Sequence, residues 1–480
     1  MNTQELLDPQ QWAERTCGSV QLQDLRRTRR AVQAGTTLAE NPLGSLPAQM
    51  HTWKETKALY RLLEEPDVTF AALMQPHMQE TRQQAHASGV VLLGQDTTDI
   101  DLSHRRKISG VGQIGNERGR GFFVQTVLAV RPQTREVLGC MAQEPFVRIP
   151  APQGEQRHQR RKREERETDV WMRQVHAIGT PEPASLWVHV GDRGADMFPF
   201  FQACQTTQTH FLVRAAQNRR VEESEEEINY SLMRTRSWPS QASRPFEVPA
   251  RHGHPGRQTQ LQLAFGQLTL LPPRHEPRAG QVPVTVWVIR AWEEQARDAE
   301  EPLEWIWLTS VPTTTLEQAW ERVDWYRHRG LVEDDHQCLK SGCRIEERQG
   351  PRVDGLIRLL GLLSPLAVRL LQIRGYARCQ PERPAHEVIE PLMLAVVAQR
   401  SGHSPATMTI GSFWTEVARL GGYLARSHDG PPGWRTIWKG WLSLQTFLEG
   451  VHFAFHLRLE NVGKNQVFQA GGEKPFLSFP

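Results

Sequence analysis

Short apolar runs separated by polar segments predict a set of buried strands. They cover residues 89–96 (GVVLLGQD), 122–130, 136–142, 185–192 (SLWVHVGD), 210–214 and 305–309. Each run is short and rich in Val, Leu, Ile, Phe or Trp, which favours strands over helices. The charged stretch 153–177 predicts a solvated helix between the third and fourth runs. Strands mixed with helices in this way predict an α/β fold.

The order of these elements predicts how the sheet is connected. The first three strands can form an antiparallel meander, and the helix can carry the chain across so that the fourth strand lies parallel to the first. This is the topology of a ribonuclease-H-like mixed sheet core. Asp96 ends the first run and Asp192 ends the fourth, so we expect the two carboxylates side by side. One acid at a strand end can be a turn residue or a helix cap, but two on neighbouring strands indicate a site.

Patterns on either side of this core divide the chain into three expected domains. Residues 1–74 and 379–480 have helical periodicity, and residues 75–378 hold the core. Period-two alternation predicts a β-rich insertion within the core at about residues 215–304. An apolar stretch over 351–376 is expected to be a helix broken at Pro365. Its arginines favour a buried helix over a membrane span.

Residues 315–340 predict a helix with a polar stripe. At about 100° per residue, the four side chains of Tyr326, Arg329, Glu333 and Lys340 project within about 60° of one another. Such a stripe suits a metal ion and a phosphate, although a solvated helix face is the alternative. Together, Asp96, Asp192 and Glu333 would supply the oxygen ligands for two Mg²⁺ or Mn²⁺ ions that catalyse phosphoryl transfer.

Composition and charge add little evidence for a partner. The chain has 480 residues, a net charge of +3 and 39% hydrophobic residues, so local basic patches must carry any affinity for nucleic acid. Two basic patches could supply this affinity. One lies on a predicted helix, for which a solvated face is the alternative, and the other lies in a loop. They consist of Arg26, Arg27, Arg29 and Arg30, and of Arg105, Arg106 and Lys107. Six cysteines without a CxxC pair and a polar N-terminus without a signal core favour a cytoplasmic protein with reduced thiols.

The chain resembles a known family. Tyr326, Arg329, Glu333 and Lys340 fit the Y-x2-R-x3-E-x6-K signature of bacterial insertion-sequence transposases with a DDE catalytic triad. The stretches QDTTDIDLSHR around Asp96, GDRGAD around Asp192, WKETKALYRLLEEPDVT near the N-terminus and ARLGGYLARS near the C-terminus are similar to the cut-and-paste transposases of composite transposons. The resemblance therefore covers nearly the whole chain.

The resemblance implies a cut-and-paste DNA transposase. Asp96, Asp192 and Glu333 would hold the two metal ions, and the other signature residues, Tyr326, Arg329 and Lys340, would contact phosphates of the transposon ends. Domain 1–74 would bind the inverted ends of double-stranded DNA, domain 75–378 would be catalytic, and domain 379–480 would pair two subunits in a synaptic complex. The ends would be cut through a hairpin, and their 3′-hydroxyls joined to target DNA.

Several points stay open at this level. Trp305 aligns with a tryptophan near which a flipped base is held in the family, and a buried strand tryptophan is the alternative. Gly330, Asp334 and Asp335 depart from better-known members and leave the rate and the end geometry open. A catalytically silent end-binding regulator and a structure-specific nuclease on the same fold are the competing functions.

Overall fold

The computed structural model describes residues 8–115, 118–150, 152, 154–156, 159, 166–222, 230–248, 256–274, 282–294, 302–379, 381–426 and 429–461. These residues form a mixed α/β structure with a large mixed sheet and helical N- and C-terminal regions. The chain divides into two compact units, Met1–Cys379 and Gln380–Pro480. The division of the chain into three functional domains stays a prediction.

The N-terminal region is helical, as expected. It contains α2 (Pro9–Cys17), α3 (Leu25–Glu40), α4 (Leu46–Gln49), α5 (Trp53–Glu64) and α6 (Phe70–His86). Four of these helices begin after a residue whose side chain accepts a hydrogen bond from the first turn, which stabilises a helix start. These capping residues are Asp8, Asp24, Thr52 and Thr69. The local sequence thus sets where the helices begin.

The central strands have the predicted connections. The structure contains β1 (Val90–Asp101), β2 (Gly112–Ile114), β3 (Gly119–Arg131), β4 (Glu136–Phe146), β5 (Leu186–Gly191) and β6 (His210–Arg214). Strands β1, β3 and β4 form the antiparallel meander, with β3 in the middle. Strand β5 runs parallel to β1, and β6 runs parallel to β5. The order β3-β1-β5-β6 therefore brings the first and fourth predicted strands together.

Strand β1 is longer than predicted, so Asp96 does not end it. The strand continues to Asp101 because its polar half pairs with β3, from Asp96 opposite Thr126 to Asp101 opposite Gly121. Pairing with β5 stops earlier, at Gly94 opposite Val190. Asp96 therefore lies two residues beyond the β1–β5 pairing while it is still held by β3.

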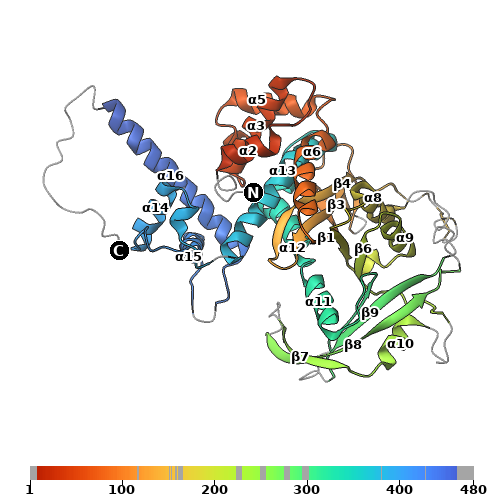
Figure 1. Ribbon diagram of the computed structural model, residues 1–480. Helices are drawn as coiled ribbons and strands as arrows, with labels where there is room; N and C mark the ends of the chain where they lie inside the picture. Colours follow the sequence, from red (N-terminus) through yellow and green to blue (C-terminus); the bar gives the residue numbers. More distant parts are fainter. Residues whose placement is uncertain are drawn as a thin grey trace. The chain divides into compact units, whose positions relative to one another are not determined.

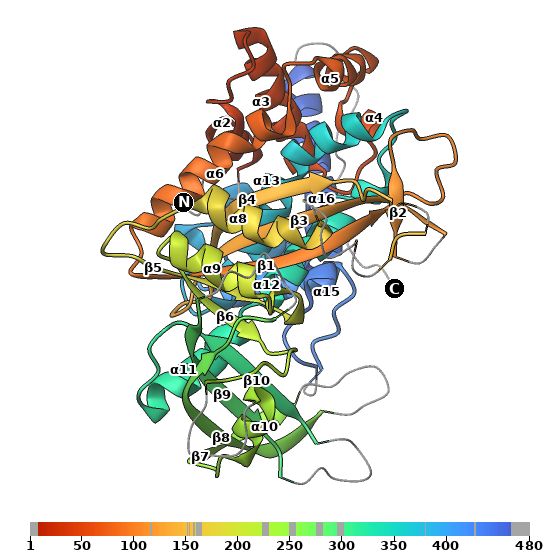
Figure 2. The same cartoon turned by 90° about the vertical axis from the view of Figure 1, so that its right-hand side faces the viewer.

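The segment predicted as a β-rich insertion contains strands that belong to the main sheet rather than to a separate one. Helix α10 (Ser231–Ser237) precedes β7 (Ala242–Val248), β8 (Arg257–Leu270) and β9 (Val284–Trp292), which β10 (Glu304–Thr309) follows. Strand β10 pairs with both β6 and β9, and the order continues through β8 to β7. Figure 1 and Figure 2 show these green strands extending from the core strands as part of one ten-stranded sheet.

Apolar side chains from both ends of the sheet are buried under helices. Helices α8 (Val170–Ile178) and α9 (Phe198–Thr206) pack together, and their cluster includes Phe211 on β6 and Val288 on β9. Within the predicted helix over 153–177, the described residues include the turn η1 (Glu167–Asp169) and then α8 from Val170. Most of its charged residues lie outside the described part of the chain.

Helix α13 (Val353–Cys379) is continuous through Pro365, contrary to the expected break. A proline inside a helix costs about 3 kcal/mol. Burial of the flanking leucines, among them Leu363 and Leu366, outweighs that cost. Among the described helices, its part Val353–Gly375 is long and apolar enough to cross a membrane, with a mean hydropathy of 1.7. Within that stretch 83% of the apolar window is buried in the protein, and a core helix meets the same criterion.

The predicted helix over 315–340 is divided. Helix α11 (Leu316–Arg327) is followed by α12 (Gly330–Gln337) and then by the π-helical turn η4 (Cys338–Gly342). Between α11 and α12 the backbone N–H groups bond to carbonyls three residues back, as at Arg329 to Tyr326 and Val332 to Arg329. This tighter turn and the wider π turn change the rotation per residue, so a single 100° stripe does not describe the side chains.

The described residues of the unit Gln380–Pro480 are mainly helical, as expected. The unit contains η6 (Ala385–Glu387), α14 (Pro391–Ser401), α15 (Ile410–Leu420) and α16 (Trp434–Asn461). Helices α14 and α15 both pack against α16. Trp414 on α15 stacks on Trp441 of α16 with ring centroids 5.3 Å apart, and Phe413 is fully buried. These aromatic contacts give the unit a core of its own.

Candidate functional site

The sheet register places Asp96 and Asp192 on neighbouring strands at the same level. Gly94 is opposite Val190 in the parallel β1–β5 pair, and each aspartate comes two residues later. Asp192 follows β5 and caps the short turn η2 (Arg193–Ala195), where its Oδ1 accepts a hydrogen bond of 2.7 Å from Gly194 N. The predicted neighbourhood of the two acids is thus present in the fold.

Asp96 lies in a strongly perturbed electrostatic environment. Burial, together with the negative charges of Asp192 and Glu333, raises the pKa of Asp96 to about 6, although the positive charge of Arg329 opposes the shift. Glu333 comes from α12, so the three carboxylates reach this point from three separate elements. Their mutual effect on the pKa shows that they share one electrostatic environment.

Arg329 lies between two of the acids. Its Nη1 is 3.7 Å from Asp96 Oδ1, and its Nη2 donates a hydrogen bond to Glu333. Burial of the Arg329 guanidinium opposes its charged form, but the charges of Glu333 and Asp96 outweigh burial and raise its pKa. The side chain of Glu333 is 55% exposed, whereas that of Asp96 is 20% exposed. One cation therefore lies between two carboxylates here.

Tyr326 joins this group through Arg329 and the aromatic side chains of β10. Its ring centroid is 5.5 Å from that of Trp307. Burial raises the pKa of Tyr326, while the cations Arg329 and Arg214 oppose the shift. Trp305 stacks beside Trp307 at 6.3 Å and also meets Phe246 at 5.8 Å. Trp305 is half-buried.

Lys340 is not part of the cluster around Asp96. Its Nζ donates to Asp99 Oδ1 at 2.8 Å and lies 3.8 Å from Glu346 Oε1. Asp99 is three residues beyond Asp96 on β1, so Lys340 extends the site along that strand. Of the four signature residues, the structure brings Tyr326, Arg329 and Glu333 together and places Lys340 beside them.

The donor chemistry of these side chains suits hard divalent cations, which prefer carboxylate oxygens. The observation that supports the fit is the raised pKa of Asp96, because buried neighbouring carboxylates repel one another unless a cation offsets their charge. Within the described residues, however, three His, Cys, Asp or Glu side chains are nowhere arranged closely enough to hold a metal. The guanidinium of Arg329 supplies the positive charge between Asp96 and Glu333.

Two residues that the sequence reasoning missed belong to this site. Arg214 ends β6 and is one position beyond the pairing of Gly191 with Val213, which places it beside Asp192. Burial lowers the pKa of Arg214, and the nearby cation Arg193 lowers it further. The signal was present, because Arg214 is a charged residue at the end of a buried run. No such sequence signal exists for His336, whose Nδ1 is 3.9 Å from Asp96 Oδ2 because α12 packs against β1.

The predicted basic patches have mixed surroundings. Arg26 pairs with Asp24 at 2.9 Å, Arg27 pairs with Glu65 and Asp67, and Arg30 donates to Gln33. Arg29 is exposed, as are Arg106 and Lys107 in the loop after β1, whereas Arg105 is half-buried. Arg27 thus links α3 to the turn after α5, and the exposed cations are the better candidates for DNA phosphates.

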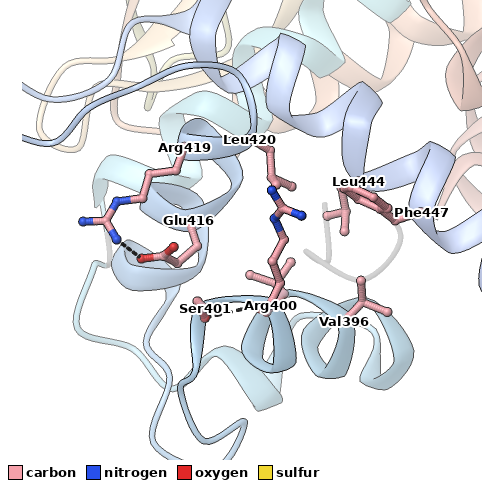
Figure 3. Close-up of a pocket in the computed structure, with 9 residues that line it drawn as sticks. Val396, Arg400, Ser401, Glu416, Arg419, Leu420, Leu444 and Phe447 are labelled. Carbon is pink, nitrogen blue, oxygen red and sulfur yellow. Dashed lines mark hydrogen bonds and ion pairs between the residues drawn. The ribbon is translucent and has the colours of Figure 1, made fainter. Parts of the chain in front are cut away.

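A separate hollow lies in the unit Gln380–Pro480. Its volume is about 220 Å³, and Val396, Arg400, Glu416, Leu444 and Phe447 are among its lining residues. Figure 3 shows the ion pair between Arg419 and Glu416 at its wall, 2.9 Å long. All residues predicted for catalysis lie in Met1–Cys379, so this hollow is not the candidate site.

One comparison with known proteins concerns the N-terminal helices. Residues 9–68 match the family model described as transposase DNA-binding. The matched segment contains α2, α3, α4 and α5, including the patch of Arg26, Arg27, Arg29 and Arg30. This match supports a DNA-processing enzyme of the transposase class with DNA as its partner. The N-terminal region of the chain is thus similar to the DNA-binding domain of transposases.

Proposed function

We propose that the protein is a cut-and-paste DNA transposase. It binds the inverted ends of a transposon as double-stranded DNA, cleaves them by metal-dependent phosphoryl transfer through a hairpin, and joins the 3′-hydroxyls to target DNA. The observation that carries the proposal is that Asp96, Asp192 and Glu333 share one electrostatic environment, in a chain whose N-terminal region matches transposase DNA-binding domains. The sheet order β3-β1-β5-β6, which is the order expected for a ribonuclease-H-like core, supports it.

The acids have separate positions in the proposed mechanism. Asp96, Asp192 and Glu333 would hold two Mg²⁺ or Mn²⁺ ions, which would activate the attacking oxygen and stabilise the leaving oxygen. Asp96 is anchored by β3, and Asp192 by its bond to Gly194, so both carboxylates are pre-positioned. Glu333 is more exposed and can turn away from Arg329 when DNA arrives.

The cations and the phenol would bind the DNA backbone. Arg329 and Arg214 flank the acids and can each donate several hydrogen bonds to a phosphate. Tyr326 can donate its hydroxyl, and Lys340 would follow the backbone along β1 from its place at Asp99. Trp305, half-buried beside Trp307, offers a face on which an extruded base can stack.

The proposal includes the assembly and the compartment. Two copies would pair through the helices of Gln380–Pro480 when each holds a transposon end, and the protein would act in the bacterial cytoplasm. A silent end-binding regulator is the second candidate, and the closed Arg329 bridge between Asp96 and Glu333 is the observation that favours it.

The test is an excision assay with purified protein, Mg²⁺ and a plasmid that carries the element's own inverted ends. We expect excision and strand joining by the wild type, and end binding without cleavage for Asp192→Ala and for the wild type in EDTA. Glu182→Ala, at an exposed acid before β5, is the matched control and should cleave normally. Cleavage by Asp192→Ala would refute the acid assignment. Binding without cleavage by the wild type would support the regulator, and cutting independent of the ends would support a nuclease.

A further inference from the structure

A buried arginine joins the matched N-terminal segment to the turn that carries Lys340. Arg348 is 3% exposed. Its Nε and Nη2 both donate to the carbonyl of Cys343, at 3.0 and 2.7 Å. Its Nη1 donates to the carbonyl of Gly44 at 2.7 Å and to Gln49 Oε1 at 2.9 Å, and its Nη2 also donates to the carbonyl of Pro42 at 3.0 Å. All five N–H groups of the guanidinium are thus used.

The acceptors belong to two segments that are far apart in the sequence. Pro42, Gly44 and Gln49 lie between α3 and α5, inside the region similar to transposase DNA-binding domains. Cys343 closes the π-helical turn η4, because its N–H donates to the carbonyl of Cys338 at 2.8 Å. Lys340 lies within that turn. Arg348 therefore holds both segments with a single rigid group.

A second arginine strengthens the same junction. Arg344 has a φ of 52°, which is uncommon for a residue other than glycine. In this conformation its Nη1 donates to the carbonyl of Leu43 at 3.2 Å. Arg344 and Arg348 thus engage the consecutive carbonyls of Pro42, Leu43 and Gly44. This is a built joint rather than one chance contact.

The hollow beside this joint does not suit an anion. It has a volume of about 210 Å³, and Leu43, Tyr60, Arg344, Glu347 and Arg348 are among its lining residues. The donors of Arg348 are used within the protein, and Arg344 also bonds to Glu347. The arginines here are therefore arranged to connect two segments and not to bind a phosphate.

We infer that Arg348 is a positioning residue that fixes the turn of Lys340 relative to the N-terminal DNA-binding segment. This inference rests on the proposed function, since it concerns how DNA held by that segment reaches the acids. A segment that binds the DNA end can deliver the scissile phosphate only if its distance to η4 is constant. An error of an ångström in such placement slows an enzyme by about a hundredfold. The five hydrogen bonds of Arg348 keep this distance constant.

The test compares Arg348→Met with a matched variant, Arg369→Met. Arg369 on α13 is also buried and also bonds to the N-terminal region, but at the carbonyl of Ala39 in α3 rather than at the carbonyls of Pro42, Leu43 and Gly44. Both variants lose a buried guanidinium, so both should melt earlier. Below those melting points, we expect Arg348→Met to bind end DNA within about threefold of wild type and to cleave it at least about tenfold more slowly. Arg369→Met should bind and cleave as the wild type does.

Two readouts separate positioning from simple destabilisation. If Arg348 acts through Lys340, Arg348→Met combined with Lys340→Ala cleaves no more slowly than Lys340→Ala alone, because effects through one group do not add. Hydrogen exchange of peptide 338–343, without DNA, should quicken in Arg348→Met and stay unchanged in Arg369→Met. Fully multiplicative rates in the double variant, or unchanged exchange in Arg348→Met, would overturn the inference. If the proposed function is wrong, the wild type will not cleave end DNA. Hydrogen exchange of peptide 338–343 then still tests whether Arg348 holds the turn of Lys340 in place.

Discussion

Replacement of the two aspartates of the GDRGAD motif should have different effects. Replacing Asp192 should mainly abolish cleavage, and replacing Asp196 should mainly lower stability. Asp196 is 3% exposed. Its Oδ2 accepts hydrogen bonds from the backbone N–H groups of Ala216 and Gln217, at 2.7 and 2.8 Å, and its Oδ1 accepts from Arg219 at 2.7 Å. Asp192 is more exposed and caps only one turn. The motif therefore combines a structural acid with a candidate metal ligand.

The magnitudes follow from what each replacement leaves behind. Asp196→Ala leaves the nearly buried guanidinium of Arg219 and two backbone N–H groups without their carboxylate acceptor. Breaking such a buried ion pair costs about 3–5 kcal/mol. Asp192→Ala removes one capping bond, which costs about 1 kcal/mol. We therefore expect Asp196→Ala to lower the free energy of unfolding by about 2–4 kcal/mol more than Asp192→Ala does.

Urea unfolding followed by tryptophan fluorescence measures both variants against the wild type. The stability of Asp192→Ala should stay close to that of the wild type while its cleavage is lost, and Asp196→Ala should unfold at clearly lower urea. Equal losses of stability in the two variants would refute this assignment, as would an Asp196→Ala protein as stable as the wild type. Arg219→Met is a useful companion, because it should destabilise the protein from the other side of the same pair.

Three further predictions follow from the buried groups. Arg214→Gln should slow single-turnover end cleavage by about tenfold or more without changing the melting temperature, because it removes a cation beside Asp192. In a Cys379→Ser background, a thiol reagent should not react until the protein unfolds, because burial raises thiol pKa values, to about 12 for Cys17 and Cys343. Burial lowers the pKa of His77 from 6.5 to about 4, where its Nε2 accepts from Cys140 N–H at 3.0 Å. The unfolded state then binds the extra proton first, so up to about 3 kcal/mol of stability should be lost as the pH falls from about 6.5 to 4, and His77→Gln should reduce that loss.

Much of the core was predictable because its signals are local. A run such as residues 210–214 is apolar whatever its neighbours, and β6 has those bounds. General rules of connection then place β5 beside β1, and with it Asp192 beside Asp96. The neighbourhood of these two acids needed no more than strand content and topology.

Features that depend on distant partners could not be read from the sequence. Strand β1 extends past Asp96 only because β3 supplies hydrogen bonds to its polar half. The insertion joins the main sheet only because β10 pairs on both edges. Arg348 looks like a solvated residue in EERQG, and its bond to Gly44 spans 304 positions of the chain. Periodicity carries no information about such contacts.

The shared hydrogen bonds of β10 have a consequence for anyone seeking a minimal catalytic fragment. With its neighbour β9 deleted, β10 would become the edge of the sheet, with open backbone groups flanked by Trp305 and Trp307. Exposed apolar edges recruit strands from other molecules. The present outer strand, β7, avoids this with Arg244, Pro245 and Glu247, which discourage further pairing. Deleting β7, β8 and β9 should therefore yield a protein that aggregates. The insertion thus keeps the whole sheet soluble.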